Sequence, residues 1–185
     1  MENPKNFFTN TISSGQFAVD ENGHAKLFGE YVIFFPSKVI LELIEILESK
    51  ISHEKLKEIL LEVSEFQIKQ AYKRYISKFG MDKIDKRKII DFSIDVLNML
   101  GWGKVAIINT SLNDKTFDVF SKSAIMPIRY HEKHGSTSKN PVDTYLLGLL
   151  KGIFECVFET DLVAEETKCM AMGHNECRFV GKPVS

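Results

Sequence analysis

The last twenty residues, Glu166 to Ser185, constrain the fold of this chain more than any other stretch. Cys169 and Cys177 lie on either side of the triplet Gly173-His174-Asn175, whose residue types favour a turn. A β-hairpin that closes there places the two cysteines opposite each other, with Cβ atoms about 4.5–5.5 Å apart. This separation suits two thiolates on one zinc ion better than a disulfide, whose Cβ atoms lie about 3.8 Å apart. The alternative is two thiols buried as small apolar side chains.

The sequence offers further candidate ligands close to the two cysteines. In a regular strand Glu165 shares a face with Cys169, whereas Glu166 reaches the same ion only if the strand contains a bulge or a bend. Asp143 lies near the start of a predicted helix, where stabilisation by the helix dipole is an alternative role. His174 at the tip of the turn is expected to be exposed.

Size and composition limit the class of protein. A chain of 185 residues can bury enough surface to fold as one domain without a metal. The 24 basic and 25 acidic residues give a net charge of −1, which argues against a nucleic-acid or membrane-binding surface. Three cysteines cannot all pair, and no signal peptide or membrane-spanning run is evident, so we expect a cytoplasmic protein.

The spacing of apolar residues predicts an α+β fold with an antiparallel sheet packed with helices. A flexible N-terminus over residues 1–14 and a single domain over residues 15–185 are expected. The predicted helices cover residues 37–48, 52–79, 86–100 and 140–158, and the predicted strands cover residues 17–19, 25–27, 31–35, 104–109, 116–121, 125–130, 162–172 and 176–180. Residues 131–139 are predicted to form an exposed loop. Gly148 and Gly152 lie four apart in the last helix and predict close packing on that face.

The tail resembles the 4-vinyl reductase domain family, and in particular the aromatic-sensing domains of phenol-responsive activators. The residues that carry the resemblance are Glu166, Cys169, Met172-Gly173-His174, Cys177-Arg178 and Gly181-Lys182-Pro183. The resemblance covers about residues 15–183 and is specific from residue 141 onward. It implies a fold similar to the nitric-oxide-signalling/Golgi-transport ligand-binding fold.

The resemblance also implies a zinc site. In the phenol sensors three cysteines and a glutamate hold the ion, and Glu166, Cys169 and Cys177 fall on three of these positions. Asp143 takes the place of the remaining cysteine, and an oxygen ligand is acceptable to zinc. Such a site needs backbone N–H donors to offset its negative charge, which the start of the helix after Asn140 is expected to supply.

A ligand pocket is the third implication. The sensing histidine of the family aligns near Leu97 and its pocket tryptophan near Ser121, so a phenol-like ligand loses its polar anchor here. The side chains expected to face the equivalent pocket are mainly apolar: Leu97, Trp102, Phe117, Val119, Leu147 and Ile153. The alternative is that these side chains fill a solid core.

We therefore predict a stand-alone, zinc-stabilised sensor domain that binds a small apolar or aromatic molecule. The resemblance implies a homodimer that signals through a separate regulatory protein, with no direct contact to nucleic acid or membrane. The alternatives are a dimeric scaffold, like the vesicle-tethering subunits that share the fold, and an accessory protein of tetrapyrrole vinyl reduction. No nucleotide-binding loop or flavin motif is found, so the sequence favours a binding protein over an enzyme.

Overall fold

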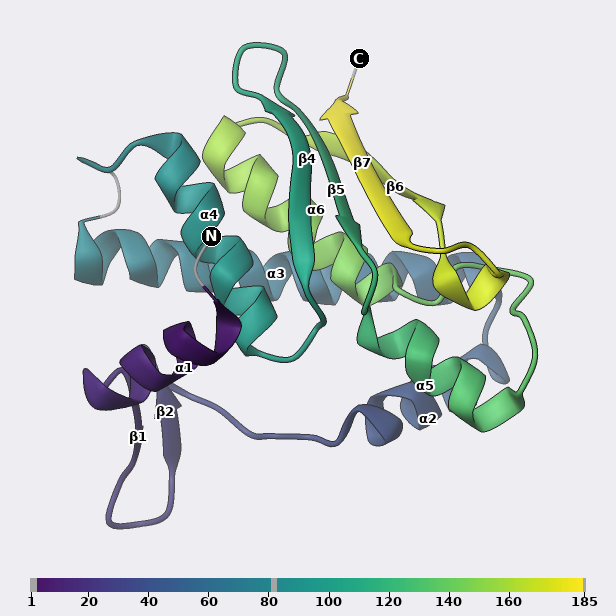
Figure 1. Cartoon of the computed structure of the whole chain (residues 1–185), viewed down its shortest axis with the longest axis horizontal. Helices are drawn as coiled ribbons and strands as arrows, with labels where there is room; N and C mark the ends of the chain where they lie inside the picture. The colour runs from purple at the N-terminus through teal and green to yellow at the C-terminus, as the bar shows by residue number, and fades with distance from the viewer. Residues whose placement is uncertain (1–2, 81–82, 185) are drawn as a thin grey trace.

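A four-stranded antiparallel sheet packed against helices forms the centre of the molecule, as the predicted α+β class requires (Figure 1). The computed structural model describes residues 3–80 and 83–184. The strands of this sheet are β4 (Val105–Ser111), β5 (Thr116–Ser121), β6 (Leu162–Lys168) and β7 (Cys177–Pro183), in the spatial order β4-β5-β7-β6. β7 therefore pairs with β5 on one side and with β6 on the other.

The helix α6 (Thr144–Phe158) lies between this sheet and the long helix α3 (His53–Phe79). The glycines of α6 allow the two helices to approach closely, as predicted. A Cβ atom added at Gly148 would lie 1.9 Å from Ser64 Oγ, and one added at Gly152 would lie 3.1 Å from Ile68 Cβ. On the sheet side, the ring of Phe117 stacks on Phe154 with centroids 4.2 Å apart. Because both faces of α6 are covered, nearly all of its residues are buried.

The N-terminal elements form a second, smaller layer. A three-stranded sheet consists of β1 (Phe17–Val19), β2 (Ala25–Leu27) and β3 (Glu30–Tyr31), which confirms the first predicted hairpin. It is followed by α2 (Ser37–Glu48), and after α3 the helix α4 (Lys86–Met99) leads into β4. Aromatic contacts hold this layer to the rest: the Phe28 ring lies 5.5 Å from that of Tyr75 and 5.9 Å from that of Phe92.

Two segments differ from the predicted elements near the N-terminus. The sequence predicts a flexible segment over residues 1–14, of which residues 1–2 lie outside the described part, but Pro4–Ser13 forms the helix α1, which packs against α4. Its start is specified by Asn3, whose side chain accepts a hydrogen bond from the backbone N–H of Lys5, and by proline at the first helical position. Of the strand predicted over residues 31–35, only Tyr31 lies in β3, because the chain then leaves its partner strand.

Two further differences lie next to the C-terminal hairpin. The sequence predicts a strand over residues 125–130, but Ile125–His134 forms the helix α5, which ends at Gly135 in the left-handed conformation. The predicted exposed loop therefore begins after His134. The helix predicted to start at Asn140-Pro141 begins only at Thr144, with Asp143 in the N-cap position. A short 3₁₀ helix, η2 (Met170–Met172), separates β6 from the turn before β7.

Over the part of the chain that the structure describes, no helix is both long and apolar enough to cross a membrane.

Candidate metal centre and ligand cavity

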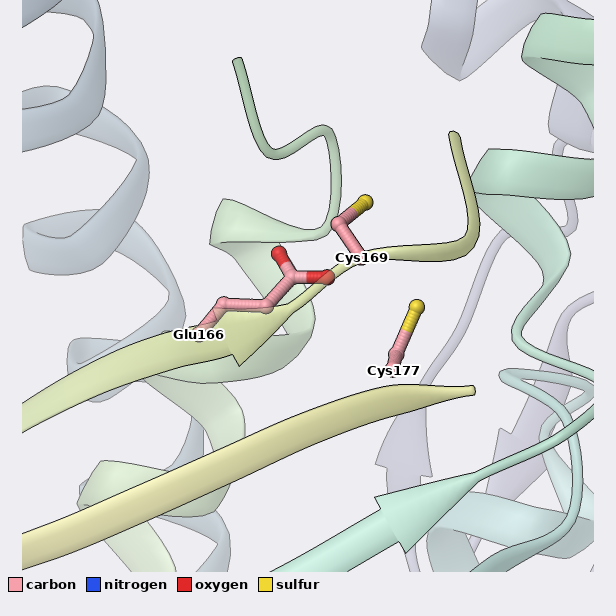
Figure 2. Close-up of side chains that lie close together, drawn as sticks. All are labelled: Glu166, Cys169 and Cys177. Atoms are coloured by element: carbon pink, nitrogen blue, oxygen red, sulfur yellow. The ribbon is translucent and has the colours of Figure 1, made fainter. Parts of the chain in front are cut away.

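A register shift in the final hairpin brings Glu166 to the two cysteines. Before the shift Glu166 pairs with Phe179, and after it Lys168 pairs with Arg178. This irregularity is the bulge that a role for Glu166, rather than Glu165, requires. A carboxylate oxygen of Glu166 and the Sγ atoms of Cys169 and Cys177 all lie within 4.8 Å of one another. Figure 2 shows the three side chains converging on the space between the end of β6 and the start of β7.

Asp143 reaches the same group of side chains from the start of α6. Although it occupies the N-cap position, its side chain caps no backbone N–H group. The carboxyl group is fully buried, and its Oδ2 atom accepts a hydrogen bond of 3.4 Å from Cys177 Sγ. The structure therefore gathers the four predicted ligands, two thiols and two carboxyl groups, at one place.

Several oxygens at this site have no protein partner. Asp143 Oδ1 and both carboxyl oxygens of Glu166 are buried and accept no hydrogen bond from the residues that the structure describes. A buried polar atom without a partner is costly, by about 1–3 kcal/mol. Thiolate sulfur and carboxylate oxygen are both ligands that zinc takes in proteins. The unpartnered oxygens beside two free thiols thus fit a bound zinc ion.

Burial and mutual repulsion change the acidity of all four groups. Burial, together with the negative charge of Cys169, raises the pKa of Asp143 to about 8. Burial and the charge of Asp143 raise the pKa of Glu166 to about 10. The hydrogen bond from Cys177 lowers the pKa of Cys169 to about 6, and the same bond raises the pKa of Cys177. Without a cation, the cluster therefore favours one thiolate beside three protonated groups.

Backbone N–H groups support the sulfur atoms. The N–H of Met170 donates a hydrogen bond of 3.3 Å to Cys177 Sγ, and a backbone hydrogen bond at Val142 helps to lower the pKa of Cys169. Val142 lies in the segment after Asn140 from which the sequence predicts such donors, although that segment precedes α6, whereas Met170 belongs to η2. His174 is exposed, as expected, and its ring contacts the backbone of Cys169.

A cavity of about 610 Å³ lies on the other side of α6. Most of its lining is apolar or aromatic, and it is formed by α3, α4, α6 and the segment from β3 to α2. Of the predicted pocket residues, Leu97, Trp102 and Ile153 line it. The other three, Phe117, Val119 and Leu147, are buried in the core and are not part of the lining. For these three, the alternative of a filled core describes the structure.

The cavity also has polar groups that the sequence did not reveal. The ring of Tyr145 stacks on Trp102 at 5.3 Å, and its hydroxyl donates a hydrogen bond of 2.6 Å to Gln67 Oε1. Glu30 and Arg74 are the charged residues of the lining, and they form an ion pair of 3.1 Å. Gln67 lies on α3, and nothing in the sequence of this helix indicates a cavity rather than a packed core.

Comparison with known proteins supports the C-terminal resemblance. Residues 131–183 match the model of the 4-vinyl reductase domain family, which confirms the resemblance predicted from the tail. No curated protein matches the chain. Because the family match covers only the C-terminal part, the fold of the remaining residues is compared through solved structures.

Solved structures with a similar fold include the following three. The phenol-responsive sensory domain of the transcription activator PoxR, solved with phenol, has a TM-score of 0.82 at 13% sequence identity, covering 99% of this chain and 91% of that chain. A vinyl-4-reductase family protein from Methanocaldococcus jannaschii has a TM-score of 0.53 at 15% identity, covering 83% and 85%. A trafficking protein particle complex subunit 3 from Naegleria fowleri, covalently bound to palmitic acid, has a TM-score of 0.54 at 11% identity, covering 80% and 95%. At these identities the likeness concerns the fold.

Proposed function

We propose that this chain is a sensor domain that binds a small apolar or aromatic molecule in the cavity next to α6. The cavity is the observation that carries the proposal. Its volume of about 610 Å³ lies within the range of about 300–1,000 Å³ typical of small-molecule sites, and its mainly apolar lining with a few polar groups is also typical. The similar fold of a phenol-responsive sensory domain supports a sensor, and that of a subunit bound to palmitic acid supports an apolar ligand.

The second part of the proposal is that Asp143, Glu166, Cys169 and Cys177 hold a zinc ion. The support is the chemistry of the donor set: two thiols and two buried carboxyl groups, with three oxygens that lack a partner among the described residues. A zinc ion bound there would serve as a structural cross-link and would offset the repulsion among the four groups. Free thiols are consistent with a reducing compartment, so we also propose a cytoplasmic location.

α6 connects the two sites. Asp143 precedes its first turn, and Tyr145, two residues later, lines the cavity, as do Leu149 and Ile153 on the following turns. A change in the position of this helix would therefore change the geometry of both the cavity and the proposed metal site. We propose that the metal site fixes the start of α6. Tyr145 then stays stacked on Trp102 in the cavity lining before a ligand binds.

The output of the sensor requires a partner, and an exposed apolar surface is available. Large apolar side chains are exposed on the segment before α2, on α2 and on α3: Ile33, Phe34, Phe35, Val39, Leu43, Ile46, Val63 and Phe66. We propose that a second copy of the chain covers this surface in a homodimer, and that the dimer acts on a separate regulatory protein. Light scattering coupled to size exclusion measures the mass directly. The wild type should form a dimer and Phe66→Glu, at a position on this surface outside the cavity lining, should form a monomer; a monomeric wild type at micromolar concentration contradicts the homodimer.

Ligand binding can be followed with the tryptophan of the chain. Trp102 is its one tryptophan and lines the cavity, so titration with 2-naphthol or decanol should change its emission and raise the melting temperature. Ala71 also lines the cavity, and Ala71→Phe should block binding by occupying part of its volume. Glu54→Phe is the control, because Glu54 is exposed on the same helix and lies outside both the lining and the proposed dimer surface. Equal binding by both variants and the wild type, or no binding by any, argues against the cavity as a ligand site.

Metal analysis tests the zinc site. The purified wild type should contain about one zinc ion per chain, and Cys169→Ser and Cys177→Ser should each lose it and melt at a lower temperature. Asp143→Cys should retain zinc, whereas Asp143→Ala should bind it more weakly. Equal affinity in all three Asp143 forms removes this residue from the site, and the absence of zinc from carefully purified wild type removes the site itself.

A further inference from the structure

Arg74 in the cavity lining has a donor without an acceptor. Its Nη1 atom forms the ion pair of 3.1 Å with Glu30 Oε2. Its Nε atom, in contrast, is buried and has no hydrogen-bond partner among the residues that the structure describes. Burying an unpaired donor of a charged group costs more free energy than burying an unpaired donor of a neutral group. We therefore expect an acceptor for this atom that the described residues do not supply.

The geometry of the guanidinium group indicates the kind of acceptor. Nε–H and Nη2–H lie on the same edge of the planar group and can bind two oxygens of one carboxylate side by side. The pair with Glu30 uses Nη1, on a different edge, and does not occupy this fork. A single neutral oxygen would satisfy only one of its two donors.

We infer that the ligand of the cavity is a carboxylic acid with an apolar body, and that Arg74 binds its carboxylate. This inference rests on the proposed ligand-binding function and specifies its ligand class. Two other polar side chains of the lining support it, since their hydroxyl donors are already in use. Tyr145 donates to Gln67, and Ser93 Oγ donates to the backbone oxygen of Ile89. The apolar body then contacts the aliphatic and aromatic lining around Trp102.

The charge of the cavity can accommodate an anion. Glu30 and Arg74 are the charged residues of the lining and neutralise each other. The side chain of Glu30 is 46% exposed, and exposed ion pairs are worth at most about 1 kcal/mol. Glu30 can therefore turn to solvent when a carboxylate approaches, and the pair of Arg74 with the ligand keeps the cavity neutral.

Matched acids and alcohols test the inference on the full chain as purified. The probes are decanoate against decanol and 2-naphthoate against 2-naphthol, titrated at neutral pH and followed by the emission of Trp102. The wild type should bind each acid roughly ten- to a hundredfold more tightly than the matching alcohol, as expected for a charge-assisted pair. Arg74→Gln should remove this preference and leave alcohol binding unchanged. Arg87→Gln, on α4 outside the lining of this cavity, is the matched control and should retain the preference.

A second variant keeps the test valid if Arg74→Gln does not fold. Glu30→Gln removes the negative charge that lies next to the incoming carboxylate and repels it, so it should tighten the binding of the acids severalfold without affecting the alcohols. If acids bind no more tightly than alcohols to the wild type, or if Arg74→Gln keeps the preference, the ligand class is wrong while the cavity remains a ligand site. If neither acids nor alcohols bind, the proposed function fails as well.

Discussion

The number of protons released when zinc binds is the sharpest test of the buried cluster. At pH 7 Cys169, with a pKa of about 6, is already mostly ionised in the metal-free protein. Asp143 and Glu166, with pKa values of about 8 and 10, and Cys177, with a raised pKa, retain their protons. Zinc requires deprotonated ligands, so binding to all four groups should release about three protons, one from each protonated group.

An ordinary exposed site with the same four residue types would behave differently. With the usual pKa values of 3.8 for Asp, 4.5 for Glu and 9.0 for Cys, both carboxyl groups would already be ionised at pH 7, and only the two thiols would lose protons. That site would release about two protons. The additional proton is therefore the signature of burial. A release of three protons also makes the zinc affinity fall about a thousandfold for each unit of pH decrease near neutrality.

Calorimetric titration of the metal-free protein in buffers of different ionisation enthalpy measures the proton number directly. Asp143→Asn is the matched control, because its side chain keeps the shape of aspartate and has no proton to lose. It should release about two protons and bind zinc more weakly. A wild-type value of two or fewer, unchanged in Asp143→Asn, would refute the reasoning, because the carboxyl groups would then be ionised before the metal binds.

Three further predictions concern packing, pH and coupling. Gly148→Ala should lower the free energy of unfolding by about 1–3 kcal/mol, because the new methyl group meets Ser64 Oγ. Gly152→Ala, whose new methyl group has contacts of 3.1 Å or more, should lower it less. Urea denaturation of both variants should show this order. The metal-free protein should lose about 1–2 kcal/mol of stability from pH 5 to pH 6. The pKa values of Asp143 and Glu166 are raised above their unfolded values, so in this window the two groups ionise only on unfolding, which favours the unfolded state. Greater stability at pH 6 than at pH 5 contradicts this sign. Zinc added to the metal-free protein should change the emission of Trp102 through Tyr145, and an unchanged spectrum on stoichiometric zinc binding contradicts this coupling.

The elements with long apolar stripes could be predicted from the sequence. α2, α3 and α4 lie within one residue of their predicted bounds, since a helical stripe longer than ten residues is distinct from a strand pattern. The final hairpin was predictable in outline, because a turn around Gly173 has few alternatives, but the first predicted strand, residues 162–172, ends at Lys168, and η2 occupies its last three residues. Its register after the shift, with Lys168 opposite Arg178, is the one that the predicted turn requires.

Short segments could not be predicted reliably, because their conformation depends on what they contact. The run of residues 125–130 is compatible with a strand or a helix, and the burial of Met126 and Pro127 in α5 decides for the helix. The cavity was predictable only in part, because Tyr145 and Arg74 line it from helices far apart in sequence. Equally, no local pattern distinguishes Phe117, which stacks on a ring of α6, from a residue that lines a cavity.

The packing of α6 limits how the binding of a ligand in the cavity could move the surrounding elements. Gly148 and Gly152 bring the middle of this helix into close contact with α3, so a sliding motion between the two helices meets a steric barrier at Ser64. The start of α6 is attached instead through Asp143 to Cys177 at the beginning of β7. A ligand that displaces Tyr145 therefore acts on the part of α6 that is held by the cluster of acids and thiols. If the chain is the proposed sensor, the hairpin of β6 and β7, rather than α3, is the element through which ligand binding would reach the proposed regulatory protein.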